Sequence, residues 1–168
     1  MTDWFTESLH PYIGQKLKIE RVICQITTEF QELLIFENKF FGKVLVLDGI
    51  IQITERDEFI YHEMLSHVPI MFHDNPSDLL IIGGGDGGIL REVLKHRSVQ
   101  KVVMVELDPI VVENCKHFFP EVSRGAFDDP RLQLIIGDGL DYVSTTQTRH
   151  DIITVSYTHL TLPTTPYV

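Results

Sequence analysis

The residues best suited to chemistry are a cluster of glycines and three carboxylates. The glycines follow one apolar run and are Gly83, Gly84, Gly85, Gly87 and Gly88. Glycine lets the backbone turn sharply and lie against a ligand where a Cβ would clash. Amide groups at the start of a helix also present partial positive charge to a ligand. The glycine spacing fits both the dinucleotide fingerprint and the adenosylmethionine loop, so the loop by itself leaves both ligands open.

Two of the carboxylates end predicted strands. Glu106 lies 18 positions beyond Gly88, where a carboxylate accepts the hydroxyl protons of a ribose in dinucleotide and adenosylmethionine folds. A helix-capping or solvated acid is the weaker alternative for Glu106. Asp138 suits the amino group of adenine, and Gly139 lets the base approach the backbone. Asp138 is equally suited to cap a helix that starts near Leu140.

The third carboxylate, Asp86, lies inside the glycine loop itself. An acid there opposes the positive potential that would attract a pyrophosphate or a carboxylate. If its side chain faces the ligand, Asp86 suits an ammonium or a sulfonium group instead. The alternatives are that Asp86 points to solvent or caps the helix.

Alternating strands and helices must position these groups. The run Leu79 to Ile82 predicts a strand buried on both faces, and a helical pattern begins at Ile89. Asp108 and Pro109 predict the start of another helix, which runs to about Phe119. Three further strands are predicted at Val102 to Val105, Leu132 to Ile136 and Asp151 to Val155. This order predicts an α/β fold with a Rossmann-like parallel sheet of the adenosylmethionine-dependent transferase type, incomplete in this chain.

The segment before this sheet has a different pattern. From Leu17 to Thr54 it is strand-like, with turns at Glu37 to Lys39 and at Asp48-Gly49, which predicts a small antiparallel sheet of about four to six strands. A helical pattern then covers Glu58 to Val68 and stops before Pro69. We therefore predict an antiparallel β domain over residues 1–57, a partial Rossmann-like nucleotide-binding domain over 58–155, and a tail over 156–168.

Composition excludes several classes of function. The 168 residues carry 14 basic and 24 acidic side chains, a net charge of −10, which argues against a nucleic-acid partner. The apolar runs are too short to cross a bilayer, and no export signal is visible, so no membrane association is expected. Cys24 and Cys115 show no metal-ligand or redox spacing and predict two buried free thiols in a reducing cytoplasm.

Several motifs resemble the spermidine synthases, which belong to the polyamine aminopropyltransferase family. They are WFTE at 4–7, FQELLIFEN at 30–38, FGKVLVLDGIIQITERDEFIYHEMLSHVP at 41–69, LLIIGGGDGGILRE at 79–92, MVELDP at 104–109, DDPR at 128–131 and IIGDG at 135–139. The run LDGIIQITERDEFIYHE is specific to this family, well beyond a generic glycine loop. The resemblance covers residues 4 to about 155.

The resemblance implies transfer of an aminopropyl group from decarboxylated S-adenosylmethionine to putrescine, which gives spermidine and methylthioadenosine. The decarboxylated donor is a co-substrate, and neither a further cofactor nor a metal is expected. The resemblance places the donor ribose at Glu106, the adenine at Asp138 and Gly139, the donor nucleoside near Gln31 and the donor amine at Asp86. The acceptor would meet His62, and Gln52 and Tyr61 would line the channel between the substrates.

One position departs from the family pattern. Family members place a catalytic aspartate directly after the fourth strand, where this chain has Ser156, and a neutral serine cannot serve as the base. We therefore expect that the chain leaves the family pattern near Val155, by truncation or by an artefact in the sequence, and that it is inactive as written. The resemblance also implies a homodimer or homotetramer for the complete protein, and the aromatic arm at Trp4 and Phe5 is compatible with an interface.

Three other functions compete with aminopropyl transfer. An adenosylmethionine-dependent methyltransferase would use the same sheet, but its loop must accept the donor's carboxylate, which Asp86 would repel. A nicotinamide dehydrogenase is disfavoured because the same acid opposes a pyrophosphate. A catalytically inactive binding homologue would bind the donor without turnover.

Overall fold

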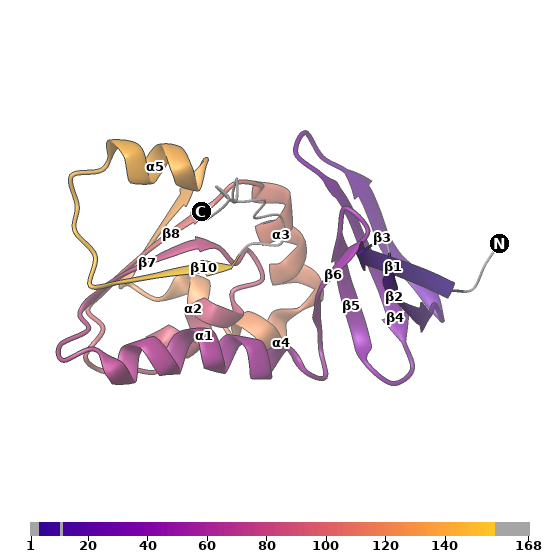
Figure 1. The fold of residues 1–168 in the computed structure, drawn as a ribbon, viewed down its shortest axis with the longest axis horizontal. Coiled ribbons are helices and arrows are strands. Elements are labelled where there is room, and N and C mark those ends of the chain that lie inside the picture. Colours follow the sequence, from indigo (N-terminus) through magenta and orange to yellow (C-terminus); the bar gives the residue numbers. More distant parts are fainter. Residues whose placement is uncertain (1–3, 11, 157–168) are drawn as a thin grey trace.

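The structure, a computed structural model, describes residues 4–10 and 12–156 (Figure 1). Its strands are β1 (Trp4–His10), β2 (Ile13–Lys18), β3 (Arg21–Thr27), β4 (Glu32–Asn38), β5 (Gly42–Leu47), β6 (Ile50–Thr54), β7 (Asp78–Gly83), β8 (Lys101–Glu106), β9 (Leu132–Ile136) and β10 (Ile152–Ser156). Its helices are α1 (Glu58–Phe72), α2 (Gly88–Leu94), α3 (Pro109–Phe118), α4 (Pro120–Ser123), the short 3₁₀ helix η1 (Ala126–Asp128) and α5 (Gly139–Thr145). The predicted tail lies outside the described residues, except for Ser156.

The C-terminal part contains a parallel sheet whose strands lie in the order β10-β7-β8-β9. Every neighbouring pair in this sheet is parallel, which confirms the predicted Rossmann-like fold class. The chain places β8 and β9 on one side of β7 and then returns to add β10 on the other side. Such a reversal of strand order opens a crevice at the carboxyl ends of the strands, where ligands of doubly wound sheets bind. Here the reversal lies between Gly83 of β7 and Ser156 of β10, which are paired in register.

Alternate residues of the buried strands face two separate cores. Leu79 and Ile81 of β7 pack with α1 and α2 on one face of the sheet. Leu80 packs on the other face, where Tyr142 of α5 covers it. Figure 1 shows this arrangement, with α1 and α2 below the parallel sheet and α5 above it. The sheet is therefore covered on both faces, as its continuous apolar strands require.

The antiparallel sheet predicted between Leu17 and Thr54 is confirmed with four strands, whereas the strand-like segment around Leu17 belongs to a second, two-stranded sheet. A hairpin of β1 and β2 forms its own two-stranded sheet and packs, through Phe5 and Leu17, against a four-stranded sheet in the order β3-β4-β5-β6. The predicted turn between β5 and β6 is confirmed, because Asp48 and Gly49 have φ of 48° and 76°, as a type I′ turn requires. The Asn38 turn between β4 and β5 is also confirmed, since the Asn38 side chain accepts hydrogen bonds from the amides of Phe40 and Phe41, both at 2.9 Å.

One shared core joins the two parts. Residues of α3 and α4 pack against β4, β5 and β6 in a single cluster of buried side chains: Leu33, Ile35, Leu45, Ile53, Val111, Cys115, Phe119 and Val122. Cys115 is buried there, and burial raises the pKa of its thiol well above the usual value. Both cysteines are free, but Cys24 is only partly buried, so the prediction of two buried thiols was wrong for Cys24. Its thiol lies beside the Asn114 side chain at 3.5 Å, close to the outer edge of this core.

Helix α1 is longer than predicted, because Pro69 lies inside it and does not end it. A proline in a helix lacks the N–H that would bond the carbonyl four residues earlier. That carbonyl belongs to Leu65, and the hydroxyl of Thr154 in β10 donates to it over 3.4 Å. The neighbouring strand therefore supplies the donor that the proline removes.

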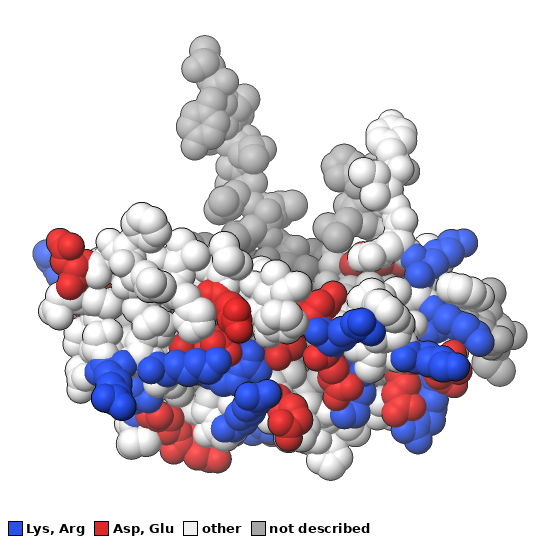
Figure 2. Space-filling view, turned by 90° about the horizontal axis from the view of Figure 1, so that it is seen from below, with Lys and Arg blue, Asp and Glu red and all other residues white. Residues whose placement is uncertain are grey.

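Charged side chains of both signs are interspersed on the surface below α1 and α4, and neither sign forms a continuous patch (Figure 2). Acidic residues still outnumber basic ones by 24 to 14 in the whole chain. In the part of the chain that the structure describes, no helix combines the length and the apolar character needed to cross a membrane.

Candidate functional site

The glycine loop connects β7 to α2 at the carboxyl edge of the parallel sheet. Gly83, Gly84 and Gly87 have φ of 77°, 80° and 78°, a region that other residues rarely adopt. The amide of Gly87 donates to the carbonyl of Gly84 over 2.8 Å, which closes the turn before α2 begins at Gly88. The predicted sequence of strand, glycine turn and helix is therefore confirmed.

Glu106 reaches this loop from the end of β8. Its carboxylate accepts hydrogen bonds from the amides of Gly85 at 2.9 Å and Asp108 at 3.1 Å. A Cβ at Gly85 would lie 3.0 Å from the Glu106 carboxylate and 2.9 Å from Val111. Burial raises the pKa of Glu106, although these amide hydrogen bonds act in the opposite direction. The structure thus places a buried carboxyl group against the loop, where the sequence predicted a ribose-binding acid.

Gln31 lies in the connection between β3 and β4 of the N-terminal sheet and reaches the same edge. Its side-chain amide donates to the Asp108 carboxylate at 3.0 Å, and the hydroxyl of Thr28 donates to the same oxygen at 2.7 Å. The other carboxylate oxygen of Asp108 caps α3 by accepting the amide of Ile110 at 2.9 Å. Asp108 therefore ties the N-terminal sheet to the strand that carries Glu106.

Asp138 and Gly139 follow β9, one strand further along the sheet. The Asp138 carboxylate accepts the amides of Leu140 at 2.6 Å and Asp141 at 3.2 Å, which confirms that it caps α5. A Cβ at Gly139 would lie 2.4 Å from Ile82, so the packing of the protein itself requires glycine there. The predicted contact with adenine stays a prediction.

Asp86 does not point to solvent, so that alternative was wrong. Its carboxylate is buried and accepts the amide of Gly88, the first residue of α2, at 2.7 Å. Nε2 of His62 lies 3.1 Å from the same oxygen, Oδ1. Burial opposes the ionisation of Asp86, but His62 and the Gly88 amide hold its pKa below the usual value. Asp86 is therefore a charged group at the start of α2.

His62 lies beneath the loop with its side chain wholly buried. A Cβ at Gly88 would lie 2.1 Å from Nδ1 of His62, so the imidazole occupies the space that any larger residue would need. Nδ1 contacts the carboxylate of Glu58, one turn earlier on α1. Burial disfavours the charged imidazole, but the carboxylates of Asp86 and Glu58 raise the pKa of His62 to about 9.

Glu58 and Arg91 were not predicted as site residues from the sequence. The guanidinium of Arg91 forms two hydrogen bonds with the Glu58 carboxylate, at 2.9 Å and 3.1 Å. It also donates to Glu92 at 2.7 Å and to the carbonyl of Val122 at 2.6 Å. The spacing of Glu58 and His62 by four residues on a predicted helix is a signal that would have paired them. No pattern along the chain connects Arg91 to either residue.

Of the remaining predicted residues, Tyr61 and Ser156 lie beside His62 and the glycine loop, whereas Gln52 lies in the N-terminal sheet. Tyr61 is 45% exposed, and its ring packs edge-on against His62 with centroids 5.6 Å apart. Gln52 is partly buried in β6, and its side-chain amide donates to the carbonyl of Ile50 at 3.0 Å. Ser156 ends β10 opposite Gly83, directly beside the glycine loop. Among the described residues, no group of histidine, cysteine, aspartate or glutamate side chains could hold a metal ion.

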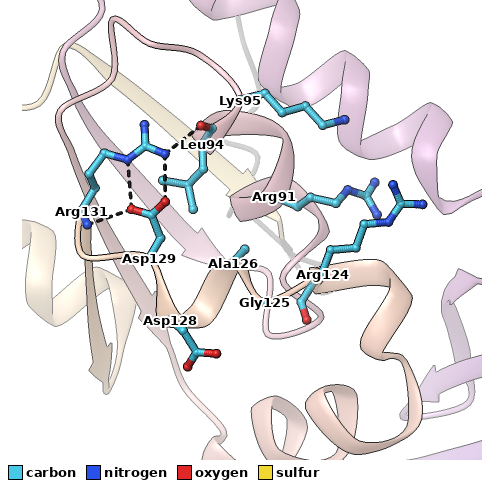
Figure 3. Close-up of a pocket in the computed structure, with 10 residues that line it drawn as sticks. Arg91, Leu94, Lys95, Arg124, Gly125, Ala126, Asp128, Asp129 and Arg131 are labelled. Atoms are coloured by element: carbon cyan, nitrogen blue, oxygen red, sulfur yellow. Dashed lines mark hydrogen bonds and ion pairs between the residues drawn. The ribbon is translucent and has the colours of Figure 1, made fainter.

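A surface hollow of about 320 Å³ lies elsewhere, between α2 and the segment around η1 (Figure 3). Its cationic side chains all face acidic partners: Arg91 faces Glu58 and Glu92, Lys95 faces Glu92, Arg124 faces Glu121, and Arg131 faces Asp129. None of the predicted binding residues lines this hollow. We therefore place the candidate site at the carboxyl edge of the sheet.

Comparisons with known proteins agree with this fold. Residues 58–166 match a family model described as the spermine/spermidine synthase domain. Residues 3–55 match one described as the spermidine synthase tetramerisation domain.

Individual relatives cover most of the chain. Polyamine aminopropyltransferase 1 of Pseudomonas aeruginosa is 55% identical over 149 residues, which are 89% of this chain and 52% of the relative. A crystal structure of spermidine synthase in complex with the transition-state analogue AdoDATO matches with a TM-score of 0.89 at 45% identity, over 94% of this chain and 54% of that chain. Spermidine synthase from Thermotoga maritima matches with a TM-score of 0.86, also at 45% identity, over 91% of this chain and 54% of that chain. The chain thus spans about half the length of these relatives.

Proposed function

Since this chain belongs to the spermine/spermidine synthase family, we propose that it carries the donor-binding half of a polyamine aminopropyltransferase. The reaction moves the aminopropyl group of decarboxylated S-adenosylmethionine to putrescine. The acceptor nitrogen bonds to the propyl carbon beside the sulfonium while the carbon–sulfur bond breaks. The products are spermidine and methylthioadenosine, and the new secondary amine releases the proton that its nitrogen carried.

The observation that carries this proposal is the pair of carboxylates on the two sides of the glycine loop. Glu106 accepts the amide of Gly85, and Asp86 accepts the amide of Gly88. A nucleoside whose ribose reaches Glu106 extends its sulfonium arm along the loop toward Asp86. An arm that ends in an ammonium group gains a charge-assisted hydrogen bond there, whereas an arm that ends in a carboxylate meets a like charge. This contrast favours the decarboxylated donor.

The other predicted residues take their places around this donor. We assign the adenine to Asp138 and Gly139 and the nucleoside to Gln31, with the loop glycines Gly83, Gly84, Gly85 and Gly87 beneath the sulfonium arm. The common edge of β7, β8 and β9, which holds the loop, Glu106 and Asp138, supports this assignment. The acceptor channel would pass Gln52 and Tyr61; the predicted contact of the acceptor with His62 is not supported, because its imidazole is wholly buried and both ring nitrogens face carboxylates.

The chemical step needs a base for the acceptor. Removing a proton from an alkylamine with a pKa near 10.4 costs about 4.6 kcal/mol at pH 7. The family's aspartate would lie at position 156, where Ser156 pairs with Gly83 beside the loop. We therefore propose that this chain binds the donor but does not turn it over. Release of methylthioadenosine from donor and putrescine by the chain as written would contradict this part of the proposal.

Assembly and location follow from the same assignment. The match of residues 3–55 to the tetramerisation domain supports a homodimer or homotetramer built through the N-terminal strands, and sedimentation velocity tests it. The free thiols of Cys24 and Cys115 are compatible with the reducing cytoplasm predicted from the sequence.

Calorimetry with two nucleosides tests the proposal. We expect the chain to bind decarboxylated S-adenosylmethionine more tightly than S-adenosylmethionine, and Asp86→Asn to reduce this preference about tenfold, because it removes one charge-assisted contact. Tighter binding of the carboxylated nucleoside would favour a methyltransferase instead.

A further inference from the structure

We propose that Glu58 and Arg91 are positioning residues that act through His62 to aim one carboxylate oxygen of Asp86 at the ammonium group of the donor. This inference rests on the proposed function, because it takes Asp86 as the group that binds the donor amine. It assigns a role to the side chains of two residues that reach Asp86 only through His62, although the backbone amide of Arg91 also donates to the carbonyl of Gly87 in the loop over 2.9 Å.

The geometry shows a continuous series of alternating charges. Asp86 contacts His62, and His62 contacts Glu58. The guanidinium of Arg91 binds the Glu58 carboxylate in a bidentate manner. All of these side chains are at least nine-tenths buried, with exposures of 10%, 0%, 9% and 8% in that order. Three separate segments of the chain contribute: the start of α1, the glycine loop and α2.

His62 transmits the position of Glu58 to Asp86. Its two ring nitrogens face two different carboxylates, and only the doubly protonated imidazolium has a hydrogen to offer to each. The raised pKa of His62 agrees with this state. Within the described residues, Nε2 of His62 is buried without a well-aligned hydrogen bond, so the contact with Asp86 is an ion pair that depends on where Glu58 holds the ring.

The same contacts determine which oxygen of Asp86 is available to bind the ligand. His62 and the Gly88 amide both contact Oδ1. We therefore assign Oδ2 to the ammonium group of the donor. Arg91 fixes the far end of the series, since its guanidinium also donates to the backbone carbonyl of Val122 in α4. This anchor prevents Glu58 from following a movement of His62.

The test compares two glutamate-to-glutamine variants of the 168-residue chain. Glu58→Gln removes the charge that holds His62 but keeps the shape of the side chain. Glu55→Gln is the matched control, because Glu55 pairs with Lys43 at 2.8 Å on the strand surface, away from the loop. Calorimetry uses decarboxylated S-adenosylmethionine and methylthioadenosine, which shares the nucleoside but has no ammonium group.

We expect Glu58→Gln to weaken binding of the decarboxylated donor about tenfold and to leave methylthioadenosine within about twofold. Glu55→Gln should leave both affinities unchanged. Equal loss of both nucleosides, or loss of neither, in Glu58→Gln would overturn the positioning role. Wild-type protein that binds neither nucleoside would instead overturn the proposed function and, with it, the ligand assigned to Asp86.

Two further measurements separate positioning from a purely structural effect. NMR of isotope-labelled histidine side chains should show that His62 loses its second proton at a lower pH in Glu58→Gln than in wild type, by at least about one pH unit. Arg91→Lys keeps the positive charge but loses the two-pronged geometry, and it should produce the same amine-selective loss to a smaller degree. An unchanged titration of His62 in Glu58→Gln would refute the positioning role of Glu58, even if that variant is less stable.

Discussion

Replacing Gly88 with alanine should destabilise the protein strongly, although alanine usually favours a helix over glycine. A Cβ at this position would lie 2.1 Å from Nδ1 of His62 and 2.2 Å from its Cε1. To restore an ordinary contact of 3.4 Å, the imidazole must retreat by about 1.3 Å. Its side chain is wholly buried between two carboxylates, so the retreat breaks at least one ion pair.

The expected cost follows from these two effects. Forcing extra atoms into a packed interior costs about 1–3 kcal/mol, and breaking a buried ion pair costs about 3–5 kcal/mol when it leaves a charge unpaired. Because the movement can be shared between His62 and α2, we expect a loss of about 3 kcal/mol in the free energy of unfolding. Urea denaturation followed by circular dichroism measures it.

Gly137→Ala is the matched control. A Cβ at Gly137 meets no atom within 4 Å, and its φ lies outside the left-handed region. Alanine there should change the free energy of unfolding by less than about 1 kcal/mol, in the stabilising direction, because it restricts the unfolded chain.

The same substitution in a His62→Ala protein tests whether the imidazole causes the destabilisation. In a His62→Ala protein the space beside Gly88 is open, so adding Gly88→Ala should cost almost nothing further. The coupling between the two substitutions would then be about 3 kcal/mol. A Gly88→Ala protein that is as stable as Gly137→Ala, or a substitution that costs the same with and without His62, would contradict this role of the imidazole.

Three further predictions concern single groups. The pKa of His62 is raised from 6.5 to about 9, so its contribution of about 3 kcal/mol is fully present below pH 6.5 and is lost as the pH rises through 9. Urea unfolding at pH 6 and pH 9.5, with His62→Gln as the reference, should show this loss in wild type alone. Asp138→Ala should lower the free energy of unfolding by about 1 kcal/mol by removing the cap of α5, whereas Asp138→Asn keeps a capping oxygen and should lose less than about 0.5 kcal/mol. Arg131→Met should cost about 2 kcal/mol, because its guanidinium donates to the carbonyl oxygens of Leu94 and Val99 at 2.8 Å and 3.1 Å. Arg21→Met, which removes a pair on the protein surface, should cost less than about 0.5 kcal/mol in the same assay.

Local signals in the sequence predicted local structure well. The turn at Asp48-Gly49 needed two residues with positive φ, and the start of α3 needed the cap that Asp108 supplies, so both were visible within a few residues. The end of α1 was predicted too early, because the rule that a proline ends a helix considers only residues nearby in the sequence. The donor that makes Pro69 tolerable is Thr154, which lies 85 positions away in the sequence.

The same distinction holds for the site. The sequence predicted that glycines line the loop so that a ligand can approach the backbone. In the structure, neighbouring side chains already explain three of them. Glu106 occupies the space beside Gly85, Phe127 and Ser123 the space beside Gly87, and His62 the space beside Gly88. The partners of these glycines come from other elements, and no spacing along the chain reveals them. Arg91 was missed for the same reason.

The neighbours of Asp86 change the electrostatic argument for the donor. The sequence suggested a lone acid whose field selects a cationic arm, but Asp86, His62, Glu58 and Arg91 together carry two negative and two positive charges. Selectivity must then act at short range, through the directed oxygen of Asp86 in a buried site. Short-range buried contacts are screened little by salt, whereas a long-range field is screened strongly. The ratio of affinities for decarboxylated S-adenosylmethionine and S-adenosylmethionine should therefore stay within about twofold between about 0.01 M and about 1 M salt in calorimetry. A ratio that falls steadily as salt rises would show that the net field of the acidic protein selects the donor, and that Asp86 has no special part in it.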